Sequence, residues 1–236
     1  MLATGALAAP ANAGPPFLTD DPEPTDLRHW EIYAPLFEIE GKNENYEGSL
    51  GAEFNYGAAP DLQITLGIPF AYSHDHSGVH AGLGDLEVSA KYRFYHDESA
   101  GIQLAAFPGI SLPIATHGLG SDHVTAFLPI WGQKDFYHWS IFGGGGYAIN
   151  SGTGNRNYWT GGVALTHEFS DSLLMGIEAD RQGADEVGGR ASTSLGIGAI
   201  VQLPRPFRLL ASAGPTFSDG GGAAEFHVFM ALGLDF

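Results

Sequence analysis

Apolar and polar residues alternate along most of this chain with a period of two. The chain ends in "AEFHVFMALGLDF". Its bulky residues share one parity, at Phe226, Val228, Met230, Leu232, Leu234 and Phe236. Small or polar residues occupy the other parity, and Phe229 is the exception. A period of two is typical of a β-strand whose two faces meet different environments.

The same alternation recurs in about twelve segments, each with roughly the 9 to 11 residues that a tilted strand needs to cross a membrane. The segments lie near residues 28–40, 46–56, 62–72, 86–94, 101–112, 123–133, 136–149, 157–169, 172–182, 190–202, 207–216 and 224–236. The first segment is the weakest because it contains Pro35, and proline normally marks an edge, a bulge or a strand end.

The connectors between these segments alternate in length. Short ones such as "GAAPD", "HDES" and "SDS" alternate with longer Gly-rich and Asx-rich ones such as "SHDHSGVHAGLGD" and "RQGADEVGG". Outer-membrane barrels have short periplasmic turns and longer outside loops. The alternation therefore predicts an even number of strands, with both termini in the periplasm.

The predicted fold is all-β, a closed antiparallel transmembrane β-barrel of about twelve strands in up-and-down meander order. An open sheet of this size would leave unpaired edges, which cost several kcal/mol for each orphaned group in hydrocarbon. A soluble sandwich also alternates. The uniform strand length, the persistent apolar parity and the aromatic residues near strand ends favour the barrel.

Composition supports a membrane-facing surface. Charged residues make up only 16% of the chain, although the formal net charge is -17, and 34 residues are glycine. No stretch has the roughly 18 unbroken apolar residues of a spanning helix. The acidity argues against a nucleic-acid partner, and the absence of cysteine excludes a disulfide framework or a thiolate metal site.

Three regions are expected along the chain. Residues 1–13, "MLATGALAAPANA", resemble the end of a secretory signal peptide, with Ala11-Asn12-Ala13 as its small-x-small cleavage pattern. Residues 14–26, "GPPFLTDDPEPTD", are rich in proline and should form an extended periplasmic segment. Residues 27–236 should form the barrel.

If the bulky parity faces lipid, the opposite parity lines the lumen and could contact a solute. The lining candidates are Glu31, Glu53, Asp85, Glu87, Lys91, Arg93, Glu178, Asp180, Arg208 and Glu225. About twelve strands leave a narrow pore or none. Two interpretations remain open: a small channel with a cation-favouring acidic lining, or a plugged lumen in which bases pair with carboxylates.

The acidic residues Asp20, Asp21 and Glu23 also allow two interpretations. They could enter the periplasmic mouth, meet Arg28 or Arg208, and act as a gate. They could equally belong to a solvated leader, which is the interpretation that the sequence slightly favours.

Histidines raise the question of catalysis or metal binding. His74, Asp75, His76 and His80 lie in one expected outside loop, but their spacing is not specific for a metal, and we expect a polar surface loop. The His138-x-Ser140 spacing is similar to that of the outer-membrane phospholipase, although "HWSIF" lacks its Asn-Gly and an Asn orienter. We therefore expect no enzyme, no cofactor and no metal.

Two stretches carry a family resemblance. The final strand, closing on Phe236, resembles the C-terminal signal that the outer-membrane assembly machinery reads. Residues 14–33, "GPPFLTDDPEPTDLRHWEIY", resemble a family of outer-membrane proteins labelled as transporter-like or after the meta-cleavage pathway of phenol degradation. The resemblance implies a barrel associated with the passage of small solutes, including hydrophobic or aromatic compounds, and no catalytic residues.

The predicted function is therefore a narrow channel or transporter in the outer membrane of a Gram-negative bacterium. Its expected partners are outer-membrane lipid and lipopolysaccharide, the assembly machinery and a small-molecule solute. The alternative is a non-conducting barrel, either structural or a lipid-modifying enzyme.

Overall fold

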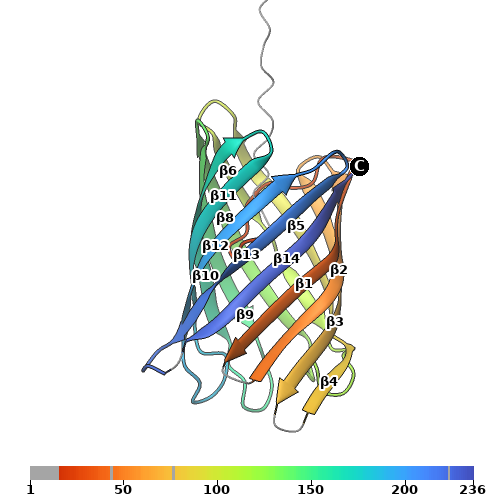
Figure 1. Ribbon diagram of the computed structural model, residues 1–236, viewed down its shortest axis with the longest axis vertical. Coiled ribbons are helices and arrows are strands. Elements are labelled where there is room, and N and C mark those ends of the chain that lie inside the picture. Colours follow the sequence, from red (N-terminus) through yellow and green to blue (C-terminus); the bar gives the residue numbers. More distant parts are fainter. Residues whose placement is uncertain (1–15, 43–44, 76–77, 223) are drawn as a thin grey trace, which may run out of the picture.

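The computed structural model describes residues 16–42, 45–75, 78–222 and 224–236, and it shows an antiparallel β-barrel (Figure 1). The expected signal-peptide residues 1–13 lie outside the described residues. The strands are β1 (Trp30–Lys42), β2 (Asn45–Ala59), β3 (Leu62–Asp75), β4 (Gly78–Leu83), β5 (Leu86–Asp97), β6 (Ile102–Ala106), β7 (Gly109–Leu112), β8 (Thr125–Phe136), β9 (Trp139–Ile149), β10 (Tyr158–Ser170), β11 (Leu173–Gln182), β12 (Ser192–Gln202), β13 (Phe207–Ser218) and β14 (Glu225–Asp235).

The barrel closes because its first and last strands pair. β1 and β14 are antiparallel from Glu31, opposite Asp235, to Gly41, opposite Phe226. Every other wall strand pairs with its neighbour in sequence, which is the expected up-and-down meander. Over the described residues, β6 and β7 form one interrupted strand and β4 only extends a hairpin, so the wall has twelve strands. The predicted fold class and strand number are confirmed.

Two details of the sheet differ from expectation. The segment 101–112 is divided at Phe107-Pro108, because a proline cannot donate a ladder hydrogen bond. The expected loop after residue 73 is partly a hairpin, in which β4 pairs with the end of β3. The predicted effect of Pro35 is confirmed as a register shift between Tyr33 and Leu36.

Loop lengths follow the predicted alternation. The short turns at 60–61, 98–101, 137–138, 171–172 and 203–206 lie at the barrel end that also carries Trp30 and Phe236. The longer connections at 113–124, 150–157 and 183–191, and residues 219–222, lie at the opposite end (Figure 1).

The outer face of the wall is apolar. Alternate residues of β12 and β14 point outward, and Leu195, Ile197 and Met230 are exposed by 45%, 56% and 54%. Ser194 and His227, which have the opposite parity on the same strands, are buried on the lumen side. A surface of this kind suits hydrocarbon rather than water. The described residues include no helix of the length and hydropathy needed to span a membrane.

Candidate functional site

The lumen contains the N-terminal segment, residues 16–26, which precedes β1 (Figure 1). Thr19 and Asp21 have no exposed surface, and Phe17 is 9% exposed. The Phe17 ring packs edge-on against Phe142 of β9 at a centroid distance of 6.0 Å, and Ala164 of β10 completes this buried cluster. The segment is therefore enclosed by the barrel, and the favoured interpretation of a solvated leader is wrong for these residues.

Glu178 of β11 fixes the course of the segment through the backbone. The amides of Leu18 and Thr19 each donate a hydrogen bond of 3.1 Å to its carboxylate. The Ser212 hydroxyl of β13 donates to the Pro16 carbonyl. A short extended segment cannot satisfy its own backbone groups, so the wall side chains satisfy them instead.

Side chains of the opposite wall hold the acidic part of the segment. The ammonium of Lys91 on β5 lies 3.0 Å from the Asp20 carboxylate and 3.8 Å from that of Asp21. The Gln63 amide oxygen accepts a 2.8 Å hydrogen bond from the Thr25 amide. Lys91 is itself 4% exposed. The segment thus bridges the lumen from β11 and β13 to β3 and β5.

Burial shifts the acidity of two carboxyl groups in this segment. Loss of hydration raises the pKa of Asp21 well above its ordinary range, and the nearby Lys91 ammonium only partly opposes that effect. Burial likewise raises the pKa of Glu23 to about 7, with Arg93 acting in the opposite direction. Both groups therefore favour their protonated forms more than the same groups would in water.

The gate candidates do enter the barrel, but with a different partner from the expected one. In the described residues Lys91 supplies the ion pair to Asp20 and Asp21, in place of Arg28 or Arg208. Arg208 instead forms an ion pair with Glu31. The Asp235 carboxylate lies 3.6 Å from the same guanidinium, which also donates a 2.6 Å hydrogen bond to the Tyr33 hydroxyl. Sequence spacing could not distinguish between Lys91 and Arg208, because both alternate inward, whereas Arg28 is exposed ahead of β1.

The remaining lining candidates have varied surroundings. Asp85 accepts hydrogen bonds from the amides of Ala115 and Ser121, and so anchors the connection between β7 and β8. Arg93 pairs with Asp61 at the turn end and donates to Gln103. Asp180 lies opposite Gly162 in the sheet, and Glu225 lies opposite Thr216. Glu53 and Glu87 line cavities, described next.

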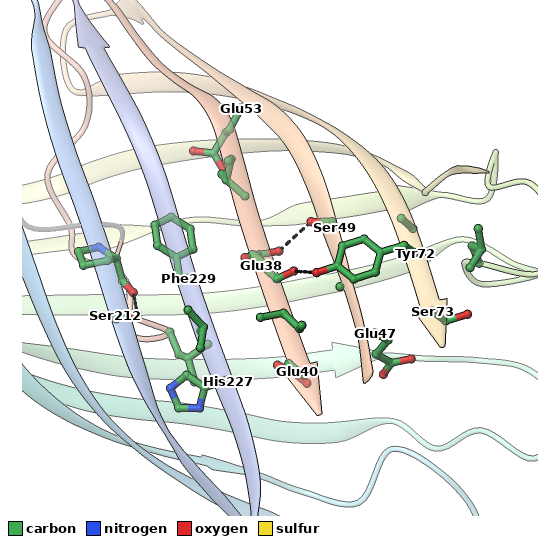
Figure 2. Close-up of a pocket in the computed structure, with 18 of the residues that line it drawn as sticks. Glu38, Glu40, Glu47, Ser49, Glu53, Tyr72, Ser73, Ser212, His227 and Phe229 are labelled. Atoms are coloured by element: carbon green, nitrogen blue, oxygen red, sulfur yellow. Dashed lines mark hydrogen bonds between the residues drawn. The ribbon is translucent and has the colours of Figure 1, made fainter. Parts of the chain in front are cut away.

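Two cavities border the N-terminal segment. The first cavity measures about 750 Å³ and includes Glu38, Glu40, Glu47, Glu53, Tyr72, Ser212, His227 and Phe229 in its lining, as Figure 2 shows. The second cavity measures about 490 Å³ and includes Leu18, Asp20, Glu87, Phe107, Phe127, Trp131 and Tyr158. The indole nitrogen of Trp131 is buried without a hydrogen-bond partner in the described part of the chain.

Sequence reasoning missed much of both cavities. It assigned Glu38 and Glu40 to no site, because the register shift at Pro35 obscures the parity of β1. The alternation signal could have placed Phe229 in the lumen, since it shares the parity of His227. Phe229 there packs against the buried group around Leu210.

The structure does not assemble the phospholipase-like pair. The Ser140 hydroxyl is buried and donates to Asp135, whereas His138 is exposed in a turn, with its Nδ1 atom 3.5 Å from Glu168. Among the histidines expected in one outside loop, His74 lies within β3 and stacks on Tyr46 of β2, with ring centroids 4.9 Å apart. His76 lies outside the described residues. Groups of three or more side chains that could hold a metal ion are not found in the described ranges.

Known structures share the barrel fold. The COG4313 outer membrane channel from Pseudomonas putida F1 is 14% identical, with a TM-score of 0.72 over 92% of this chain and 98% of that one. The NanC porin is 8% identical, with a TM-score of 0.62 over 87% and 98%. The KdgM porin, solved with disordered oligogalacturonate, is 8% identical, with a TM-score of 0.59 over 88% and 99%. A search of curated proteins found no match.

A family model matches residues 51–226 and carries the description "Putative MetA-pathway of phenol degradation". The match falls on barrel strands and does not include residues 14–33, which carried the resemblance in the sequence. It nevertheless confirms the expected family. Because the match spans most of the sequence, this chain belongs to the family of that description.

Proposed function

We propose that this protein is an outer-membrane channel for small solutes whose lumen is gated by the N-terminal segment. One observation carries the proposal. Two cavities of about 750 and 490 Å³ lie inside the barrel, and both are bordered by residues 16–20 of that segment. An apolar outer face and a closed wall supply the rest of a transmembrane conduit.

The second cavity supports small aromatic or hydrophobic solutes as cargo. Phe107, Phe127 and Trp131 contribute aromatic surface, and such surfaces favour stacked or edge-on contact with another ring. The buried Trp131 N–H has no acceptor among the described residues, so a solute oxygen would satisfy it. An unpaired buried donor costs roughly 1–3 kcal/mol, which a bound phenol or carboxylate would recover.

The N-terminal segment is proposed as the gate because few contacts retain it. The polar contacts described above come from the side chains of four wall residues, Lys91, Glu178, Gln63 and Ser212. The packing of the Phe17 ring adds to them. Movement of the segment would join the two cavities without any change in the wall. The proposed solute contacts are Glu53 in the first cavity and Glu87 in the second.

The proposed orientation places both termini and the short turns in the periplasm, with the longer connections outside. Trp30 at the start of β1 and Phe236 at the end of the chain exchange backbone hydrogen bonds at the short-turn end. The same proposal includes a cleaved leader, contact with lipid and lipopolysaccharide along the outer face, and recognition of the strand ending in Phe236 by the assembly machinery.

A non-conducting barrel is the second candidate. The buried ion pairs of Lys91 and Arg208 favour it, because they tie the lumen side chains together as a plug would. In that case residues 16–26 would stabilise the barrel, and the cavities would be closed to passage.

Conductance in planar bilayers distinguishes the two candidates. We expect the folded protein to open discrete channels, and a variant that lacks residues 16–26 to conduct more at the same voltage. Correct folding is checked by a lower apparent mass in unheated than in boiled electrophoresis samples. A correctly folded deletion variant that still passes no current would overturn the channel proposal.

A further inference from the structure

The first cavity carries a second, chemically different feature, a stripe of carboxylates (Figure 2). Glu40 of β1 lies directly opposite Glu47 of β2, and Glu38 lies opposite Ser49 one lumen-facing position further along. Side chains that face each other across antiparallel strands have Cβ atoms about 5 Å apart, and like charges there repel. Among the side chains that the structure describes, no lysine or arginine lines this cavity.

Two lumen bases of the described wall are already engaged elsewhere. Lys91 lies against Asp20 and Asp21, and Arg208 lies against Glu31 and Asp235. Neither Lys91 nor Arg208 is therefore available to the opposed pair Glu40 and Glu47. A cation from solution would relieve the repulsion between the two carboxylates.

His227 provides an independent indication of a ligand. It lies opposite Glu40 on the other side of β1, so that His227, Glu40 and Glu47 form one row across three strands. His227 is 4% exposed and lines the cavity, and its Nε2 atom has no hydrogen-bond partner among the described residues. Its Nδ1 atom lies 3.4 Å from the Thr216 hydroxyl. With a proton on Nδ1, Nε2 is left as an unpartnered acceptor in a side chain that lines the cavity.

The shape of the stripe selects among cations. Glu47 and Glu53 are six residues apart on β2, which corresponds to roughly 20 Å at about 3.3 Å per residue. A single metal ion needs its ligands within about 2.6 Å of one point, and the described residues show no group of three or more that could provide this. A linear cation with several charged nitrogens can instead contact carboxylates spread along the lumen.

From these observations we infer that the first cavity is a binding site for linear polyamines, whose ammonium groups contact Glu40, Glu47 and Glu38 and donate to His227 Nε2. The apolar lining contributed by Phe229 would contact the methylene chain between the nitrogens. This inference deepens the proposed function, because it adds a cationic solute class to the channel. It rests on that function only for the role of the site in transport.

Calorimetric titration of the full, folded protein in detergent with spermidine tests the site. We expect saturable binding that weakens as salt increases. The double variant Glu40→Gln/Glu47→Gln should weaken binding by about tenfold, given the modest energy of each partly solvated charge pair. His227→Phe keeps an aromatic ring but removes the acceptor, and it should weaken binding by about threefold.

The matched control is Glu98→Gln, which removes one exposed carboxylate from the short turn 98–101, outside both cavities, and should leave spermidine affinity within twofold of wild type. Magnesium chloride at the same concentration should compete only weakly. Equal affinity in the wild type and in the double variant, once folding is checked by the electrophoretic shift, would overturn the inference, as would magnesium binding equal to that of spermidine.

Bilayer recordings with spermidine separate this inference from the channel proposal. Discrete openings that spermidine neither blocks nor alters, together with no calorimetric binding, would refute the site and leave the channel standing. Calorimetric binding by a folded protein that never conducts would refute the channel and leave the site standing.

Discussion

Loss of the Lys91 ammonium should release the N-terminal segment from the lumen. In Lys91→Met the Asp20 carboxylate, which lies 3.0 Å from the ammonium inside the lumen, would lose its cation. Removing one partner of a buried ion pair typically costs about 3–5 kcal/mol. The segment can avoid this cost by leaving, at the loss of its hydrogen bonds to Glu178 and Ser212.

The size of the effect follows from that cost. If the free energy that holds the segment in the lumen falls by about 3 kcal/mol, the population of released segment rises roughly a hundredfold. Because the chain has no cysteine, a single Thr19→Cys substitution gives a clean probe of release. Thr19 is fully buried, and its hydroxyl has no partner among the described residues, so the substitution itself should cost little. The rate of thiol labelling then reports how often the segment is exposed.

Two further variants complete the test. Arg181→Met removes an exposed ion pair with Asp219, worth about 1 kcal/mol or less, and should leave labelling unchanged. Adding Asp20→Asn and Asp21→Asn to Lys91→Met removes the unpaired charge and should restore slow labelling. If Lys91→Met labels no faster than its parent while the barrel remains folded, the lysine does not retain the segment and the reasoning fails.

Three other predictions concern pH, the lipid face and the fit of the segment. The pKa of Glu23 is about 7 in the folded chain, above its ordinary value of 4.5, so the seated segment takes up a proton. The stability that this proton gives to the seated segment is present below about pH 4.5 and is lost as pH rises through 7. Channel open probability should therefore increase from pH 5.5 to 8, by at most about tenfold per pH unit. Glu23→Gln should flatten this profile, and an unchanged profile would refute the assignment. Ile197 points outward at the middle of β12, so Ile197→Arg should destabilise the barrel in a bilayer by about 2–4 kcal/mol, measured by urea unfolding. Val187→Arg, in the connection after β11, should have little effect. Equal costs for the two variants would contradict the placement of the lipid face. Gly198→Leu should displace the segment, because even a Cβ at that position would lie 2.7 Å from the Phe17 ring. The Thr19→Cys probe should then be labelled faster. Slow labelling would show that the ring can move aside.

The sequence by itself determined the wall of this protein. Side chains alternate across a strand as a consequence of backbone geometry, so Leu195, Ile197 and Met230 could be placed outside, and Glu53 and Arg208 inside, without knowledge of any contact. The number of strands and the alternation of short and long connections followed from the same local signals. The family was also predicted from residues, although its match falls on the barrel.

The tertiary structure alone decided the contents of the lumen. Residues 16–26 have no periodicity that could predict their position, and their partners Lys91 and Glu178 are 71 and about 160 residues away. Closing the barrel determines which inward-facing bases meet which acids, and therefore Lys91 rather than Arg208 pairs with Asp20. The opposition of Glu40 to both Glu47 and His227 depends in the same way on strand register, which a shift at Pro35 alters. Alternation is a local property of the chain, whereas pairing across a closed sheet depends on the whole of it.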